Sequence, residues 1–316
     1  MLESDLSGAD GHGVFRLPQY IRRIKAGGMA VRPHMSVHHG GAAAALVDGG
    51  NGLGALVMKK AADTAIEKAR EAGVAWVGVR NGNHAGAASV YARMPLPHDM
   101  IGLYLAIGNA NHLPPWGGID MLLSTNPIAI AVPGGEEGEV VLDMATTVAA
   151  YGKVKVAAQR GEAMPEGWMI DREGRPLTDP KRADDGFLLP IGGYKGFGLA
   201  LMFGFLAGTL NGAAFGKDVV DFNKDDKTPT NTGQAIVAVK ISAFGDVAEF
   251  RRKVDATVRD MRASARLPGV DAIRLPGEQS RATRHERAHA GIPIPPPLRR
   301  SLDTLADDLR IKRLED

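Results

Sequence analysis

The sequence has no cysteine, which excludes disulfides, thiolate metal sites and cysteine nucleophiles. Aromatic residues make up only 5% of the 316 residues, whereas glycines number 40, so we expect tight turns and close backbone approaches more than aromatic packing. The formal net charge of +2 is close to neutral and gives no reason to expect a nucleic-acid partner. These features are those of an ordinary globular protein.

The sequence also lacks a signal peptide and a membrane-spanning run. Its first ten residues, MLESDLSGAD, are acidic and contain no apolar core. The most apolar stretch, residues 196–216, has an apolar part shorter than the roughly 20 residues that span a bilayer. It therefore predicts a buried helix, and we expect a cytoplasmic protein without a membrane partner.

A dinucleotide fingerprint of the Rossmann type is missing as well. No G-x-G-x-x-G follows an expected strand, and the glycine-rich stretches 49–56 and 192–199 have a different glycine order. Any dinucleotide site in this chain would need a different architecture.

Apolar periodicity predicts a mixed α/β fold. Strands and helices intermix without regular alternation, so a simple doubly wound sheet is disfavoured. Helices are expected at 52–73, 196–211 and 246–265 and at the C-terminus after a proline-rich linker, strands at 74–80, 100–110, 126–134, 139–146 and 234–241, and a polar loop at 221–233.

The stretch GHGVFR places His12 between two glycines, with Arg16 four residues later. Flanking glycines leave a titratable ring open to close approach by a ligand or by another backbone segment. If this stretch is helical, the i, i+4 spacing puts both side chains on one face. Pro18 leaves a second possibility open, in which the helix begins only there.

Three further polar residues stand at expected element ends. His84 follows a strand in a loop of small residues, a common place for active-site groups, although a lone histidine is more often a satisfied polar group. Asp143 ends an apolar strand, where it would cap a helix, orient a base or bind ribose hydroxyls; composition alone favours the cap. Lys195 lies among glycines just ahead of a helix N-terminus, where free N–H groups and the helix dipole favour an anion, although composition alone favours a flexible turn with a solvated lysine.

The stretch RHERAHA contains an H-E-x-x-H pattern made by His285, Glu286 and His289. This is the spacing of a zinc hydrolase, with two imidazole ligands and a general base on one helix face. Three neighbouring arginines oppose cation binding, and no third ligand follows at short range. A zinc hydrolase therefore remains a remote alternative, and no metal site is expected.

Six stretches occur in one order along residues 2–280: DGHGVFRLPQYIRRIKAGG, NGNHAG, PWGGIDMLLSTNPIAIAVP, VVLDMATT, GGYKGFGLALM and LPGEQ. Together they resemble the malate/L-lactate dehydrogenase family of the second, non-Rossmann type. That family includes ureidoglycolate dehydrogenase, sulfolactate dehydrogenase, 2,3-diketogulonate reductase and piperideine-2-carboxylate reductase. The resemblance implies reversible hydride transfer between NAD or NADP and a small 2-keto or 2-hydroxy acid, or a cyclic imino acid in a ketimine reductase.

The resemblance also implies a fold and an assembly. A cofactor domain with a mostly antiparallel sheet lies beside a second α/β domain and a helical terminal part, and the chains form homodimers. Applied to this chain, residues 76–244 form the NAD(P)-binding domain, and residues 1–75 with 245–316 form the substrate and helical domain.

Site residues follow from the matching motifs. The resemblance implies His12 as the acid/base, Arg16 as the group that holds the substrate carboxylate, and His84 as a second catalytic histidine. An imidazole suits proton transfer to an alkoxide, and a guanidinium can bind a carboxylate through two parallel hydrogen bonds. The implied cofactor contacts are Asn109, Thr125, Asn126, Pro127, Asp143, Met144, Ala145, Thr146, Lys195, Gly277, Glu278 and Gln279.

Two departures from the family pattern affect the expectations. Family members carry a helical segment of a few tens of residues before the first motif, whereas this chain begins almost at it, so we expect a truncated or shortened member. Gly11 stands where the family typically has serine, which predicts altered specificity or weaker activity. A cofactor-binding protein with little turnover is therefore a further hypothesis.

Overall fold

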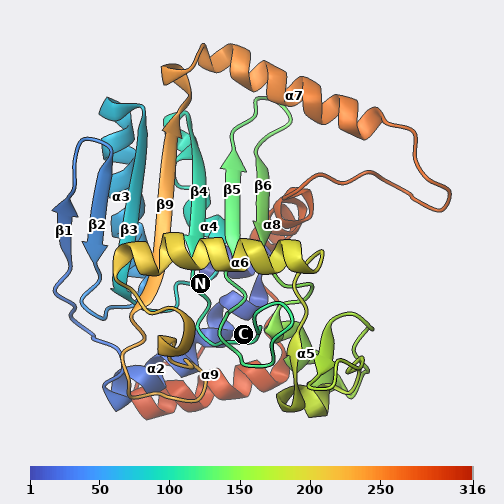
Figure 1. Ribbon diagram of the computed structural model, residues 1–316. Helices are drawn as coiled ribbons and strands as arrows, with labels where there is room; N and C mark the ends of the chain where they lie inside the picture. The colour runs from blue at the N-terminus through green and yellow to red at the C-terminus, as the bar shows by residue number, and fades with distance from the viewer. Residues whose placement is uncertain (315–316) are drawn as a thin grey trace.

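The computed structural model describes residues 1–314 and is built on one seven-stranded sheet (Figure 1). The strand order is β1-β2-β3-β9-β4-β5-β6; β2 and β3 are parallel, and the other neighbours are antiparallel. This confirms the mixed α/β class and the mostly antiparallel sheet. The strands are β1 (Ser36–His39), β2 (Ala44–Asp48), β3 (Val74–Gly82), β4 (Met100–Ala106), β5 (Ile128–Val132), β6 (Val140–Met144) and β9 (Thr232–Lys240).

Helices cover the two faces of this sheet unequally. α3 and α4 pack on one face, and α6 crosses the other face (Figure 1). α5, β7 and β8 form a small separate layer with its own buried cluster. The bounds are α1 (Leu2–Leu6), α2 (Leu17–Ala26), α3 (Gly54–Ala72), α4 (Ala88–Ala92), α5 (Tyr151–Arg160), β7 (Met169–Asp171), β8 (Gly186–Leu188), α6 (Tyr194–Ala207), α7 (Val247–Ala263), α8 (Glu278–Ala290) and α9 (Pro296–Leu309).

The main core lies between α3 and the sheet. Ala61 and Ala65 on α3 and Val77 and Ile236 on the strands are fully buried. The small helix side chains bring α3 close to the sheet, and each buried valine or isoleucine stabilises the fold by about 1.5–3 kcal/mol. This core fixes the positions at which β3 and β9 end.

Most sequence-predicted elements are confirmed. The helix expected at 52–73 is α3, which ends at Gly73 with φ +80°, and the helix expected at 246–265 is α7, which Asp246 caps through its side chain. The strands expected at 74–80, 126–134, 139–146 and 234–241 correspond to β3, β5, β6 and β9, and the C-terminal helix is α9. The strand expected at 100–110 was too long: β4 ends at Ala106, because the chain turns at Gly108 close beside Ser124.

The buried helix predicted from the apolar run 196–216 is only partly confirmed. α6 covers residues 194–207, and large apolar side chains along one face of it are exposed, with Leu199 40% and Met202 48% accessible. Only the opposite face of α6 packs on the sheet, through Phe203 and Ala207. No helix within residues 1–314 is long and apolar enough to cross a membrane.

The domain boundary expected at residue 75 falls inside β3. β1 and β2, which precede this boundary, belong to the same sheet as the strands that follow it. The division into 76–244 and 1–75 with 245–316 stays a prediction about which part of the chain performs which task.

Candidate functional site

Strand direction gathers most of the candidate residues at one edge of the sheet. β3, β4 and β6 run the same way, and β5 starts where β6 ends. His84 and Asn109 follow the ends of β3 and β4, Asp143 is the penultimate residue of β6, and Thr125 precedes β5. One edge of the sheet therefore carries polar groups from four separate stretches of the chain.

His12 and His84 are brought into contact at this edge. Their rings stack with centroids 5.4 Å apart and an interplanar angle of 23°. Tyr20 of α2 lies 2.6 Å through its hydroxyl from His84 Nδ1, and Phe222 packs against the rings of both Tyr20 and His84. We call His12, His84, Tyr20 and Phe222 the histidine cluster.

The histidine cluster favours neutral imidazoles. Removal from water, followed by the positive charge of Arg16, lowers the pKa of His12 below its usual value, and the charge of Asp143 opposes this shift. Burial, together with His12 and Arg16, holds the pKa of His84 well below its usual range. The Nδ1 atom of His12 is buried and has no hydrogen-bond partner among the described residues. A neutral ring nitrogen without a protein partner is available for proton exchange with a ligand.

The two glycines that flank His12 play different parts. A Cβ atom on Gly13 would lie 1.6 Å from Asp5 Oδ1, so this glycine is required by the close approach of the Asp5 carboxylate. Asp5 Oδ2 in turn accepts a hydrogen bond of 2.8 Å from the Val14 backbone N–H. A Cβ on Gly11 would meet nothing within 4 Å, so Gly11 leaves open space beside His12.

The backbone between His12 and Arg16 is not one helix. It forms two 3₁₀ turns, 10–12 and 14–16, separated at Gly13, and α2 begins at Leu17 with Pro18 in its first turn. Of the two possibilities left by the sequence, the helix start near Pro18 is the one observed. Arg16 bends back and donates from Nε to the Gly11 carbonyl at 2.9 Å.

Sequence reasoning missed a polar group on the other side of Arg16. Asn223, in the loop before β9, lies with its Oδ1 atom 3.4 Å from Arg16 Nη1 and 3.5 Å from Lys155 Nζ of α5. Nearby, His112 and Tyr151 stack with centroids 4.0 Å apart and an angle of 8°, and burial lowers the pKa of His112 to about 4. These residues come from four segments without a shared motif, so only the tertiary structure identifies them as neighbours.

Asp143 serves as a helix cap from a distance. Its Oδ2 accepts a hydrogen bond of 2.8 Å from the Ser89 backbone N–H in the first turn of α4. The side chain is nevertheless exposed, and its charge acts on His12. The cap that composition favoured is thus formed as a tertiary contact with α4, and Asp143 is not the N-cap residue of a helix that follows it, because α5 begins only at Tyr151.

Other expected cofactor contacts at the strand ends are engaged within the protein. The Thr125 carbonyl accepts hydrogen bonds of 3.0 Å from the backbone N–H and the hydroxyl of Thr146. The buried Asn126 side chain bridges the Gly108 N–H and the Ala200 carbonyl. These residues shape the edge of the sheet, and their role toward a cofactor stays a prediction.

The remaining strand-end residues lie in the same region. Asn109 donates from Nδ2 to Thr232 Oγ1 at 2.8 Å. Pro127 directly precedes β5, and Met144 and Ala145 lie at the facing end of β6. Their role toward a cofactor stays a prediction.

Lys195 lies in the first turn of α6, preceded by Gly192 and Gly193 at φ +58° and +64°. Its side chain is exposed and forms no hydrogen bond or ion pair within residues 1–314. The expectation of a lysine at a helix N-terminus is met, and this cation is free to pair with an anion.

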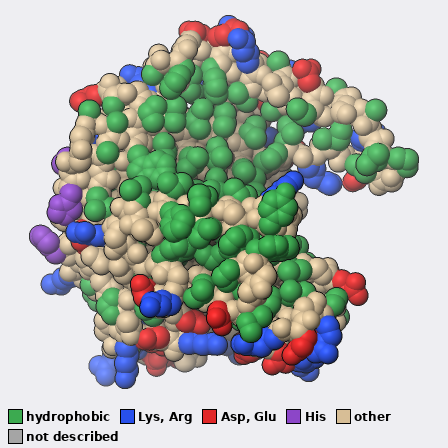
Figure 2. Space-filling view, in the orientation of Figure 1, with side chains coloured by type: hydrophobic (Ala, Val, Ile, Leu, Met, Phe, Trp, Pro, Cys, Tyr) green, Lys and Arg blue, Asp and Glu red, His purple; other side chains and the backbone are tan. Residues whose placement is uncertain are grey.

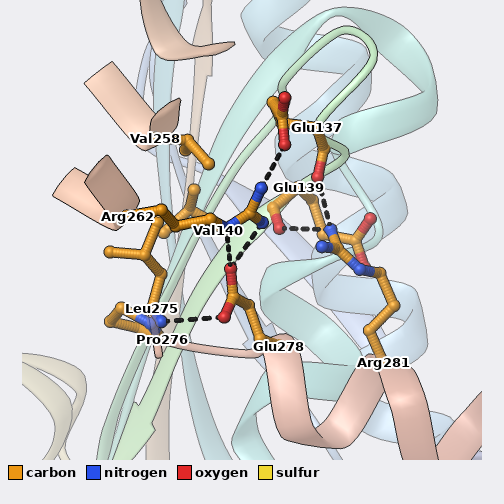
Figure 3. A pocket seen from close by; sticks show the side chains of 9 residues that line it. All are labelled: Glu137, Glu139, Val140, Val258, Arg262, Leu275, Pro276, Glu278 and Arg281. Atoms are coloured by element: carbon orange, nitrogen blue, oxygen red, sulfur yellow. Dashed lines mark hydrogen bonds and ion pairs between the residues drawn. The ribbon is translucent and has the colours of Figure 1, made fainter. Parts of the chain in front are cut away.

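Gly277, Glu278 and Gln279 begin α8 at the outer edge of β6. Gly277 has φ +90°, and a Cβ there would lie 3.0 Å from Val141. The Glu278 carboxylate accepts hydrogen bonds from Arg262 and the Leu275 N–H in the ion-pair network drawn in Figure 3. Gln279 is exposed. None of these contacts joins the three residues to the histidine cluster, and their cofactor role stays a prediction.

The H-E-x-x-H pattern lies on α8, where its histidine rings are 4.6 Å apart. The neighbouring arginines form the contacts with the rest of the chain: Arg284 pairs with Glu3, and Arg287 pairs with Asp10 and donates to the Asp5 carbonyl. Within residues 1–314 no group of three or more histidine, aspartate or glutamate side chains is arranged to hold a metal ion. α8 thus binds the N-terminal segment that carries His12.

The family model described as malate/L-lactate dehydrogenase matches residues 1–303 of this chain. Malate/(S)-sulfolactate dehydrogenase of Methanothermus fervidus is 36% identical over 312 residues, which cover 99% of this chain and 90% of the relative. Ureidoglycolate dehydrogenase (NAD(+)) of Escherichia coli is 32% identical, and the match covers 93% of this chain and 83% of the relative. (2R)-3-sulfolactate dehydrogenase (NADP(+)) of Chromohalobacter salexigens is 31% identical, and the match covers 92% of this chain and 84% of the relative.

Solved structures agree with these relatives. Sulfolactate dehydrogenase from Methanocaldococcus jannaschii superimposes with a TM-score of 0.90 at 35% identity and covers 98% of this chain and 88% of its own. Δ1-piperideine-2-carboxylate reductase from Pseudomonas syringae has a TM-score of 0.82 at 29% identity, with 96% and 89% covered.

Proposed function

The chain belongs to the malate/L-lactate dehydrogenase family and is an NAD(P)-dependent 2-hydroxy-acid dehydrogenase, in which we propose that His12, Arg16 and His84 carry the reaction. One observation above all supports this assignment: the buried Nδ1 atom of His12 has no protein partner, while its ring stacks on His84. Arg16 follows within the same two turns of backbone.

His12 is the proton carrier in this proposal. When a 2-hydroxy acid is oxidised, its hydroxyl loses a proton, which the neutral His12 ring accepts; in the reverse direction the protonated ring returns it to the alkoxide oxygen. NAD(P) supplies the acceptor and donor of the hydride. Because the pKa of His12 is lowered, the base form is already present at neutral pH.

Arg16 and His84 orient the reactants. The Arg16 guanidinium binds the substrate C1 carboxylate through parallel hydrogen bonds, which fixes the neighbouring carbon beside His12. The Tyr20 hydroxyl is hydrogen-bonded to His84 Nδ1 at 2.6 Å and orients the His84 ring toward His12. His84 thus presents its other ring nitrogen toward substrate or holds the His12 ring in place.

The chain has groups that fit a dinucleotide. Lys195 is exposed, lacks a partner within the described residues and lies among glycines in the first turn of α6, so it suits an anionic phosphate. The unpartnered His12 Nδ1 marks the reacting end. Lys195, Asn109, Thr125 and Asp143 all fall in residues 76–244, which supports that part as the cofactor domain.

The test measures absorbance at 340 nm while the protein acts on a panel of 2-keto and 2-hydroxy acids with NAD(H) and NADP(H). We expect turnover in both directions, and we expect His12→Ala to reduce kcat by about 10²-fold or more. Full activity of His12→Ala on a good substrate would refute its role. Preference for piperideine-2-carboxylate over pyruvate and oxaloacetate would identify a ketimine reductase, and cofactor binding without any turnover would identify a binding protein.

We further propose that the active form is a homodimer, as the family resemblance implies. Leu199, Met202 and Leu206 form an exposed apolar stripe on α6, and Leu210 in the turn that follows this helix is exposed as well. Figure 2 shows hydrophobic side chains gathered over α6 and over the sheet face next to it. A patch of this kind on a globular protein is typical of an interface.

Sedimentation equilibrium tests the dimer. We expect twice the chain mass for the wild type and a shift toward monomer for Leu206→Glu. Val31→Glu, which adds the same charge at an exposed apolar residue away from α6, should leave the mass unchanged. A monomeric wild type at assay concentration would refute the proposal.

A further inference from the structure

Three donors converge on one neutral oxygen beside the histidine cluster. Arg16 Nη1 and Gln19 Nε2 each lie 3.4 Å from Asn223 Oδ1, and Lys155 Nζ lies 3.5 Å from it. All three contacts are long compared with the usual 2.9–3.0 Å of such hydrogen bonds. Arg16 Nη1 and Gln19 Nε2 have shorter hydrogen bonds to Gln19 Oε1 at 3.0 Å and to the Phe222 carbonyl at 2.9 Å, whereas Lys155 Nζ forms no shorter hydrogen bond within residues 1–314.

The Asn223 side chain is held in this orientation by Asp221. Asp221 Oδ1 accepts from the Asn223 backbone N–H at 2.8 Å and from its Nδ2 at 3.3 Å. The Nδ2 group is thereby turned toward Asp221, and Oδ1 faces the two cations. This arrangement is fixed before any ligand arrives.

Neither cation has an acidic partner. Arg16 and Lys155 form no ion pair within residues 1–314. The acidic groups around Lys155 are engaged elsewhere, since Asp221 accepts from Asn223 and Asp184 lies 3.9 Å from Lys224. Burial and the charge of Arg16 both lower the pKa of Lys155, so an anion placed between the cations would relieve their repulsion.

The spacing accommodates more than one carboxylate. Arg16 Nη1 lies 3.4 Å and Lys155 Nζ 3.5 Å from the same atom, Asn223 Oδ1. The two nitrogen atoms are therefore no more than about 7 Å apart. A C1 carboxylate bound to Arg16 leaves Lys155 within reach of a group one or two carbons further along the substrate. Lys155 is also held over the ring of Tyr151, with Nζ 5.6 Å from its centroid, and Tyr151 stacks on His112.

We propose that Lys155 is a specificity-determining residue that binds a second anionic group of the substrate. The chain then prefers 2-hydroxy acids with two anionic groups, the second a carboxylate or a sulfonate, over those with one. This inference rests on the proposed function, because it assigns the first carboxylate to Arg16.

The test compares Lys155→Met with the wild type on malate and L-lactate and on oxaloacetate and pyruvate. For the dianionic pair we expect kcat/KM to fall about 10- to 100-fold, mainly through a higher KM, as loss of a charged hydrogen bond predicts. For the monoanionic pair we expect a change of less than twofold. Lys155→Arg should restore most of the preference for the dianions.

Arg160→Met is the matched control. It removes a positive charge from the same helix, at an exposed side chain that pairs with Glu162, and should leave both substrate classes unchanged. An equal loss on both classes in Lys155→Met would overturn the proposal, since the two cations would then share one carboxylate. No loss on either class would overturn it too.

A binding measurement separates this proposal from the reaction itself. Calorimetric titration of malate and lactate, with cofactor present, should show that Lys155→Met removes the advantage of malate. Failure of the wild type to turn over any 2-hydroxy acid would refute the proposed function. A malate advantage that is the same in both proteins would refute the role of Lys155 alone.

Discussion

Replacing Gly13 with alanine should damage the His12 turn, whereas the same change at Gly11 should not. An added Cβ at residue 13 would lie 1.6 Å from Asp5 Oδ1, 2.1 Å from Cγ and 2.4 Å from Oδ2, so the whole carboxylate has to move. At residue 11 no atom lies within 4 Å. Neither backbone conformation is left-handed, so the difference between the variants reports the contact with Asp5.

The magnitude follows from the bond that is lost. Displacing the Asp5 side chain, which is only 5% exposed, leaves the Val14 N–H without its 2.8 Å acceptor. An unsatisfied group of this kind costs about 1–3 kcal/mol. For a chain of this size each kcal/mol lowers Tm by about 2–4 °C, so Gly13→Ala should unfold about 2–12 °C below Gly11→Ala.

Thermal unfolding followed by circular dichroism, together with kcat, measures this difference. Gly13→Ala should also lose activity, because His12 lies next to the displaced turn. Combining it with Asp5→Ala should cost less than the sum of the two single changes, since the clash is gone once the carboxylate is removed. Equal melting temperatures for Gly13→Ala and Gly11→Ala would show that the contact carries no such energy.

Three more expectations concern the histidine cluster. The lowered pKa of His12 favours its neutral form, so the rate of 2-hydroxy-acid oxidation should be maintained below pH 6.5. Reduction of the 2-keto acid needs the protonated ring, so its rate should decline as pH rises through that lowered pKa. Because the Asp143 charge raises the pKa of His12, Asp143→Asn should move the acid limb of the oxidation profile to still lower pH; an unmoved limb in pH profiles of kcat/KM would contradict this coupling. Tyr20→Phe removes the hydrogen bond to His84 and should lower kcat by about tenfold. Unchanged kcat in steady-state assays would make Tyr20 dispensable for the orientation of His84.

Apolar periodicity predicted those helices and strands whose apolar face is covered by other parts of the same chain. α3 shows this, since apolar residues recur on the face that meets β3 and Gly73 ends the helix. α6 shows the limit of such reasoning. Its sequence is apolar on all sides, but hydrophobicity does not say whether a face is covered by the same chain or by another molecule.

The proximity of several candidate residues followed from the family motifs. These motifs assigned His12, Arg16 and His84, and the structure brings the two histidine rings into contact, while the catalytic roles stay predictions. Lys155 and Asn223 were not found, because their significance arises only from tertiary packing between α5 and the loop before β9.

The two glycines beside His12 and the start of α8 show two further features that the sequence alone could not predict. The sequence shows two equivalent glycines, and only the position of Asp5 tells which one the fold requires. Glu278 was assigned to the cofactor from its motif, yet its carboxylate is held by Arg262.

The contacts of α8 have a consequence for the order of synthesis. Arg284 and Arg287 pair with Glu3 and Asp10, partners 281 and 277 residues earlier in the chain. Because a ribosome delivers residues from the N-terminus onward, the turn that carries His12 is synthesised well before α8. It gains these two ion pairs only after α8 has also been synthesised.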